Sequence, residues 1–98
     1  MSDKQEVSIF LDTPAKLLVA LFELGGRANI RKLAEKLSKE YGTSFTSVYN
    51  TLYLLEKEGF LTIRREGRER IIELTDRGKT IAGKLAILMS ELIETLAF

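Results

Sequence analysis

The apolar positions of this 98-residue chain recur at helical spacing first and at strand spacing later. Three helices are predicted before residue 60, because apolar residues return every three or four positions. The first helix is predicted to start at Asp12-Thr13-Pro14, with Thr13 as its cap and Pro14 in its first turn. It runs to Leu24, where Gly25-Gly26 supplies the left-handed conformations that end a helix.

The second and third helices have polar caps and glycine stops. The second is predicted to open at Asn29 or Arg31 and to close at Gly42. The third is predicted to run from its cap, Ser44, to Glu58, before Gly59. At 100° per residue the third helix has two faces. The face expected to point inward contains Phe45, Val48, Leu52 and Leu55, and the opposite, polar face contains Thr46, Asn50, Tyr53 and Lys57.

After Gly59 the apolar positions alternate, which predicts two strands over residues 60–65 and 68–74. Glu66-Gly67 between them is expected to form a two-residue hairpin turn. The cross-strand pairs that this turn produces are Leu61 with Ile72 and Ile63 with Arg70. One face of the hairpin is then apolar near the domain and cationic toward the tip. Thr75 follows as the predicted cap of a last helix that runs to the end of the chain.

The predicted fold class is mainly α with one small β-hairpin. Ninety-eight residues, 45% of them hydrophobic, are enough for one compact domain and too few for two. Three segments are predicted: a tail with a short apolar stretch (1–12), a compact domain (13–75) and a C-terminal helix (76–98). Within the tail, residues 1–6 are polar and Val7–Leu11 is apolar.

Composition removes several classes of function. The chain has no histidine and no cysteine, so it lacks the commonest general base, the thiol nucleophile and soft metal ligands. An enzyme, a metal site and a cofactor are therefore not expected. Residues 1–12 lack the apolar core of a signal peptide, and no apolar run approaches the roughly 18 residues of a membrane span. A cytoplasmic protein is expected, without membrane attachment.

Net charge and amide content indicate less about function than the missing histidine and cysteine do. Fifteen basic and fourteen acidic residues leave a net charge of +1, which by itself does not indicate a nucleic-acid partner. Two Asn, one Gln, no Cys and abundant Glu, Lys and Arg follow the composition trend of heat-stable proteins. We therefore expect an archaeal or thermophilic source.

Three short helices followed by a hairpin with an arginine-rich tip is the order of a winged helix-turn-helix. The stretch from Ser44 to Leu52, continued from Leu55 to Leu61, resembles the recognition helix of MarR-like and PadR-like regulators and its exit into the wing. Leu74-Thr75-Asp76-Arg77-Gly78 is similar to their Leu-Thr-x-x-Gly junction, which leads into a C-terminal dimerisation helix. The resemblance spans about residues 13–96. It implies a homodimeric transcriptional regulator, expected to be a repressor, that binds double-stranded DNA.

The side chains of the third helix suit that role. Small or amide side chains near its start can reach base edges, which predicts base contacts by Thr46, Ser47 and Asn50. Contacts to the DNA backbone are predicted for Tyr49, Tyr53 and Ser44, and for Arg31 and Lys32 at the start of the second helix. The competing interpretation is that a solvated helix face needs polar residues in any case.

The hairpin supplies the remaining candidate contacts. Arg65, Arg68 and Arg70 are predicted to reach the DNA backbone or minor groove as the wing. Arg64 is expected to form only a surface pair with Glu69 across the strands. The competing interpretation for all of these arginines is ordinary surface charge.

The last helix carries apolar residues over an arc of roughly 160°, wider than one small domain needs. The predicted dimer interface consists of Ile81, Leu85, Leu88, Met89, Leu92, Ile93 and Leu96. The first helix and Val7–Leu11 are expected to complete it. The alternative is a monomer in which this helix folds back on its own domain.

Two further questions stay open. A winged helix can also serve as an interaction module that docks a protein of the transcription machinery, and a net charge of +1 is compatible with that role. A small-molecule effector is possible, although only Val7–Leu11 stands where MarR-like proteins carry extra helices that build a ligand pocket.

Overall fold

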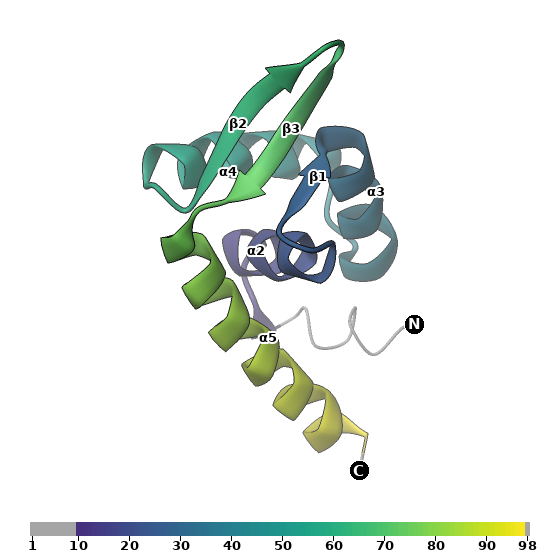
Figure 1. Ribbon diagram of the computed structural model, residues 1–98. Coiled ribbons are helices and arrows are strands. Elements are labelled where there is room, and N and C mark those ends of the chain that lie inside the picture. The colour runs from purple at the N-terminus through teal and green to yellow at the C-terminus, as the bar shows by residue number, and fades with distance from the viewer. Residues whose placement is uncertain (1–9, 98) are drawn as a thin grey trace.

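The computed structural model describes residues 10–97. Predictions for the polar tail and for most of Val7–Leu11 therefore concern residues outside the described part of the chain. Figure 1 shows the hairpin projecting from a group of short helices, with the long last helix running away from it. The elements are α2 (Thr13–Glu23), β1 (Arg27–Asn29), α3 (Ile30–Tyr41), α4 (Phe45–Lys57), β2 (Leu61–Glu66), β3 (Glu69–Leu74) and α5 (Asp76–Leu96).

Polar caps fix where the helices begin. Asn29 accepts a hydrogen bond from the Lys32 amide at 2.8 Å and opens α3, and Ser44 caps α4, both as predicted. The predicted cap of α2 is wrong. Asp12 is the extended residue, and its carboxylate accepts from the Ala15 amide at 3.1 Å, whereas Thr13 is already helical. An aspartate one position earlier therefore takes the role expected of the threonine.

The sheet has three antiparallel strands in the order β1-β3-β2. The hairpin was predicted, but the predicted register is wrong by two residues. The turn consists of Gly67 and Arg68, because Gly67 has a φ of 62° and supplies the positive φ at the first turn position. The cross-strand pairs are Leu61 with Leu74, Ile63 with Ile72 and Arg65 with Arg70. A shift of two residues keeps every side chain on its expected face.

The third strand, β1, was not predicted. Its three residues pair with β3, from Arg27 opposite Glu73 to Asn29 opposite Ile71. Only the middle one, Ala28, is buried. So short a strand carries no alternation that a sequence pattern could detect.

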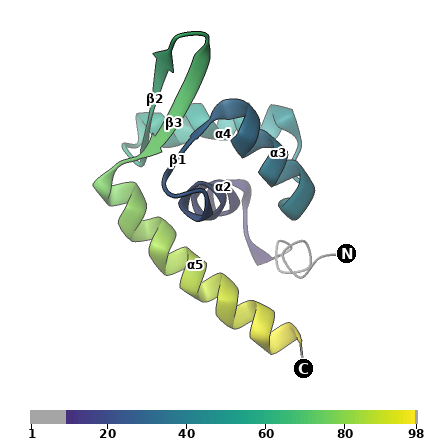
Figure 2. The ribbon, with the colours of Figure 1, turned by 45° about the vertical axis from the view of Figure 1, so that its right-hand side comes forward.

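The core lies where α2, α3, α4 and the inner face of the sheet meet. Figures 1 and 2 show α2 below the sheet, with α5 passing alongside it. The fully buried side chains of this core include Leu17, Leu21, Leu33, Leu37, Leu52, Leu61 and Ile72, and α5 adds Ala82 and Met89. The prediction that Phe45 belongs to this core is wrong, since 54% of its surface is exposed. Phe45 stands at the edge of the buried arc of α4, beside the start of α3.

The base of the wing is tied to the last helix by Thr75. Its hydroxyl donates to the Gly59 carbonyl at 2.8 Å and accepts from the Gly78 amide at 3.1 Å, so the predicted cap is confirmed. Its backbone amide also donates to the Phe60 carbonyl at 3.1 Å. One residue therefore joins the stop of α4, the start of the wing and the first turn of α5.

Two neighbours complete this junction. Arg77 donates to the Glu58 carbonyl at 3.0 Å, and its guanidinium lies 4.4 Å from the centre of the Phe60 ring. A Cβ at Gly78 would overlap the carbonyl oxygen of Phe60, which explains the glycine of the Leu-Thr-x-x-Gly segment. The close approach of two backbones here requires a residue without a side chain.

Tyr41 attaches the middle of α5 to the helices. Its hydroxyl donates to a Glu23 carboxylate oxygen at 2.7 Å and lies 3.5 Å from the Met89 sulfur. Burial raises the pKa of Tyr41, and the hydrogen bond to Glu23 raises it further. The end of α2, the end of α3 and α5 are thus held at one buried phenol.

Candidate nucleic-acid interface

The exposed polar arc of α4 lies opposite its buried residues, as predicted. Thr46 and Asn50 are exposed there, and neither side chain makes a hydrogen bond within the described residues. The buried side of the helix contains Val48, Thr51, Leu52 and Leu55. Thr46 and Asn50 are therefore free to bond an external partner.

The two serines at the start of α4 are placed differently. The Ser44 hydroxyl accepts from the Ser47 amide at 3.3 Å and donates to the Ser47 hydroxyl at 3.0 Å. Ser47 is half-buried. Both hydroxyls serve the helix cap, and their contacts to DNA stay a prediction.

The wing separates its charges between the two faces of the sheet. On the face away from α4, Arg64 bonds Glu66 at 3.1 Å and Glu73 at 3.4 Å, and Arg27 forms an ion pair with Glu66. The predicted partner of Arg64, Glu69, is wrong. The observed register places Glu69 opposite Glu66 and brings Glu73 within reach of Arg64.

On the face toward α4 the arginines lack carboxylate partners. Arg65 and Arg70 stand directly opposite each other, and neither they nor Arg68 forms an ion pair within residues 10–97. Arg70 donates to the Tyr53 hydroxyl at 3.0 Å, which ties the wing to α4. Like charges directly across a sheet repel each other. A bound anion would relieve that repulsion.

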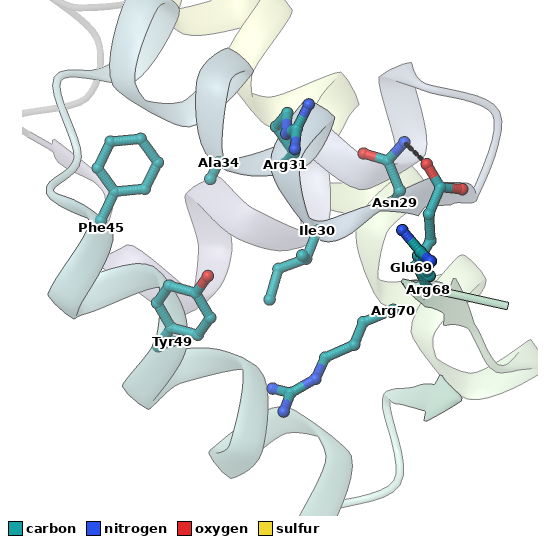
Figure 3. Close-up of a pocket in the computed structure, with 9 residues that line it drawn as sticks. All are labelled: Asn29, Ile30, Arg31, Ala34, Phe45, Tyr49, Arg68, Glu69 and Arg70. Carbon is teal, nitrogen blue, oxygen red and sulfur yellow. Dashed lines mark hydrogen bonds between the residues drawn. The ribbon is translucent and has the colours of Figure 1, made fainter. Parts of the chain in front are cut away.

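A groove of about 540 Å³ separates the wing from the starts of α3 and α4. Figure 3 shows the rings of Phe45 and Tyr49 on one side and the residues of β3 and its turn on the other. Ile30 and Ala34 contribute apolar surface between them. Its lining residues are Asn29, Ile30, Arg31, Ala34, Phe45, Tyr49, Arg68, Glu69 and Arg70.

The groove is cationic, because it combines three arginines with one glutamate, and Glu69 accepts from Asn29 at 3.4 Å. Arg31 and Lys32 are both exposed at the start of α3, and Arg31 reaches the groove. Sequence reasoning missed Phe45 as a lining residue. Its position at the edge of the apolar arc was the available signal.

The predicted dimer residues of α5 fall into two groups. Met89 is only 4% exposed, and Leu85, Leu92 and Ile93 are half-buried against the core of the same chain. Ile81, Leu88 and Leu96 are exposed. Part of the wide apolar arc thus serves intramolecular packing, and part of it faces solvent.

Neither protein-family models nor curated proteins match the chain. Among solved structures it is similar to F-93 of SSV1, with 24% identity and a TM-score of 0.74, over 87% of this chain and 94% of that one. The chain has the winged helix-turn-helix fold. The same fold relates it to the PcaV transcriptional regulator of Streptomyces coelicolor, at 17% identity and a TM-score of 0.68, over 87% of this chain and 60% of that one.

An archaeal structure shares this winged helix as well. Sso10a-2, a DNA-binding protein from Sulfolobus solfataricus, matches at 19% identity and a TM-score of 0.64, over 88% of this chain and 86% of that one. Across residues 10–97, no helix is both long and apolar enough to span a membrane. The same residues contain no group of three acidic side chains arranged to hold a metal ion.

Proposed function

We propose that the chain is a homodimeric transcription regulator that binds double-stranded DNA sequence-specifically through α4 and the wing, and that it represses transcription. The sorting of wing charges carries this proposal. Among residues 10–97, Arg65, Arg68 and Arg70 have no carboxylate partner on the face that adjoins α4, while Arg64 on the opposite face is neutralised. Unpaired cations beside an exposed polar helix face match the surface that a DNA backbone requires.

The residues divide into two roles. Asn50 and Thr46, with Ser47 beside them, read base edges in the major groove, since an amide can pair with N6 and N7 of adenine together. The other contacts go to the backbone and fix the orientation of α4. They are made by Tyr49, Tyr53, Ser44, Arg31 and Lys32, and by the wing residues Arg65, Arg68 and Arg70.

The dimer forms through the exposed flank of α5, where Ile81 and Leu88 lie beside Leu85 and Leu92. The charges along the exposed side of the helix favour an antiparallel arrangement. On one side of this flank, Lys84 lies one turn before Leu88 and Glu91 lies three residues after it. A two-fold axis near Leu88 brings Lys84 of each copy beside Glu91 of the other copy.

The solved structures to which the chain is similar support a regulator. PcaV is a transcriptional regulator and Sso10a-2 a DNA-binding protein. We propose no catalytic role for the chain.

Selection of bound sequences from a random duplex library tests the proposal. We expect a motif with two-fold symmetry, because a C2 dimer presents two copies of α4. Asn50→Ala and Thr46→Ala should each weaken binding to the selected duplex by about 1–3 kcal/mol and leave non-specific binding nearly unchanged. Thr62→Ala, an exposed threonine on the outer face of the wing, is the control. Enrichment of no motif would refute sequence-specific binding.

A protein-docking module is the second candidate, because one apolar surface is left over. Ile87 is 64% exposed on the other flank of α5, and Phe22 of α2 lies beside it. The salt dependence of binding distinguishes the two candidate functions, because a DNA complex weakens steeply as ionic strength rises, whereas apolar docking does not.

A further inference from the structure

The groove of Figure 3 is separate from the polar arc that faces the major groove in the proposed complex. At 100° per residue, Phe45 and Tyr49 point about 100° away from Thr46 and Asn50 around α4. The aromatic rings therefore face the start of α3 and the wing. Reading base edges does not use them.

Both rings are accessible to a ligand. Phe45 is 54% exposed and Tyr49 41% exposed, and they stand one helical turn apart on the same wall. Exposed aromatic faces bind flat apolar partners by stacking. In an undistorted duplex both faces of each base are covered by its neighbours, so the base that stacks on an exposed protein ring is an unpaired one.

The opposite wall is suited to phosphate. Arg68 and Arg70 come from the wing and Arg31 from α3, and none of them forms an ion pair within the described residues. Ile30 and Ala34 contribute apolar surface between the two walls. We propose that this groove binds an unpaired nucleotide of a single-stranded nucleic acid, with its base on Phe45 or Tyr49 and its phosphate on Arg31, Arg68 and Arg70.

Binding at this groove tolerates many sequences. Asn29 and Glu69 are the other polar side chains that line it, and they are bonded to each other at 3.4 Å. Every base has a face that stacks, whereas few groups here remain to read its edge. Because the groove shares its arginines with the proposed duplex contacts, single strand and duplex compete. The single-strand activity goes beyond the proposed duplex binding and is tested separately from it.

Fluorescence anisotropy with labelled oligonucleotides of about eight nucleotides tests the proposal. The probes are oligothymidylate, an abasic strand of equal length, oligouridylate RNA and a duplex. We expect oligothymidylate to bind at least about tenfold more tightly than the abasic strand, which has equal charge but no bases. A preference between the DNA and RNA strands identifies the source of the nucleotide, and either preference supports the proposal.

Variants assign the effect to the rings. Phe45→Ala and Tyr49→Ala should each weaken oligothymidylate binding about 5- to 140-fold, the equivalent of the ~1–3 kcal/mol of one stacked base. Leu54→Ala is the matched control, because Leu54 is 50% exposed on the other side of α4. All three side chains lie outside the core, and an unchanged thermal midpoint verifies the fold.

Two results would overturn the proposal. Equal binding of the abasic strand and oligothymidylate would reduce the groove to a cationic patch. Unchanged oligothymidylate binding in both aromatic variants would show that no base stacks on the rings, and a loss of duplex binding in Tyr49→Ala would then reflect only the backbone contact proposed for Tyr49. If the protein binds the single-stranded probes as expected but does not bind the duplex, the proposed regulator is refuted and this inference stands.

Discussion

At the scale of single residues, the packing of α5 depends on the missing side chain of Gly78. The first turn of α5 passes so close to Phe60 that a Cβ would overlap its carbonyl oxygen. The neighbouring atom belongs to the backbone and cannot rotate away. The segment that suggested a family resemblance in the sequence thus has a steric explanation in the structure.

Gly78→Ala should therefore destabilise the protein by about 2–3 kcal/mol, because overpacking outweighs the gain in helix propensity. Urea unfolding measures the change. Gly83→Ala on the same helix is the control, since its Cβ would meet the Phe22 ring at an ordinary 3.9 Å. That variant should gain about 0.5–1 kcal/mol. Equal effects at the two glycines would contradict the steric argument.

Tyr41 predicts a pH dependence of stability. Its pKa is raised in the folded protein, so the folded state favours the protonated phenol. The resulting stabilisation is complete below the ordinary tyrosine pKa of about 10 and is lost as the pH rises above it. Unfolding free energies measured between pH 8 and pH 11 should fall more steeply for the parent protein than for Tyr41→Phe. Tyr53→Phe, at an exposed tyrosine, is the control, and parallel curves for parent and Tyr41→Phe would contradict this role.

Several single-residue features were predictable because they depend on local chemistry. Asn29, Ser44 and Thr75 cap the helices that their side chains suggested. Phe45 was not predictable in the same way. Its angle places it at the edge of the apolar face, and only the positions of α3 and the wing decide whether anything covers it.

At the scale of elements, the hairpin shows how an error in register can leave the functional face correct. Two turns, Glu66-Gly67 and Gly67-Arg68, fit the alternating pattern, and they differ by two residues in register. Both keep Arg65 and Arg70 on the face of Ile63. The cationic face of the wing was therefore predictable, whereas the partners of Arg64 on the other face were not.

The two faces of the wing predict different effects of arginine removal. Arg65→Ala and Arg68→Ala should each weaken binding to every duplex and flatten the log-log salt dependence by roughly 0.9 for each phosphate that is no longer neutralised. In a dimer each substitution occurs twice. Arg64→Ala, which removes a guanidinium already bonded to Glu66 and Glu73, is the control and should leave the slope unchanged. Titrations at several salt concentrations measure these slopes, and identical slopes for all three variants would return the wing to ordinary surface charge.

At the scale of the whole molecule, α5 packs one side of its apolar arc into the core of its own chain and exposes other apolar residues to solvent. Its apolar arc looked like one wide interface in the sequence, because periodicity gives the angle of a residue and not what lies opposite it. The structure assigns Ala82 and Met89 to the core of the same chain. Leu88, 43% exposed, and Ile87, 64% exposed, lie on opposite flanks.

Leu88→Lys should therefore convert the proposed dimer into a monomer, because a lysine buried at the interface lacks a partner and the ~1.5–3 kcal/mol from each buried leucine is lost. Ile87→Lys, on the flank assigned no role in the dimer, is the matched control and should remain dimeric. Sedimentation at micromolar concentration distinguishes the two. A parent protein that sediments as a monomer would contradict the dimer, and a monomer produced only by Ile87→Lys would move the interface to the other flank.

The junction of Thr75, Arg77 and Gly78 has a consequence for the spacing of DNA sites. It joins the end of α4 to the start of α5 by hydrogen bonds and a backbone contact. In the proposed dimer, the two α4 helices are then locked at one separation and one relative rotation. Each base pair inserted between half-sites rotates one of them by about 35° around the DNA axis. A protein locked in this way has no hinge to follow that rotation, so it should recognise one spacing and reject its neighbours.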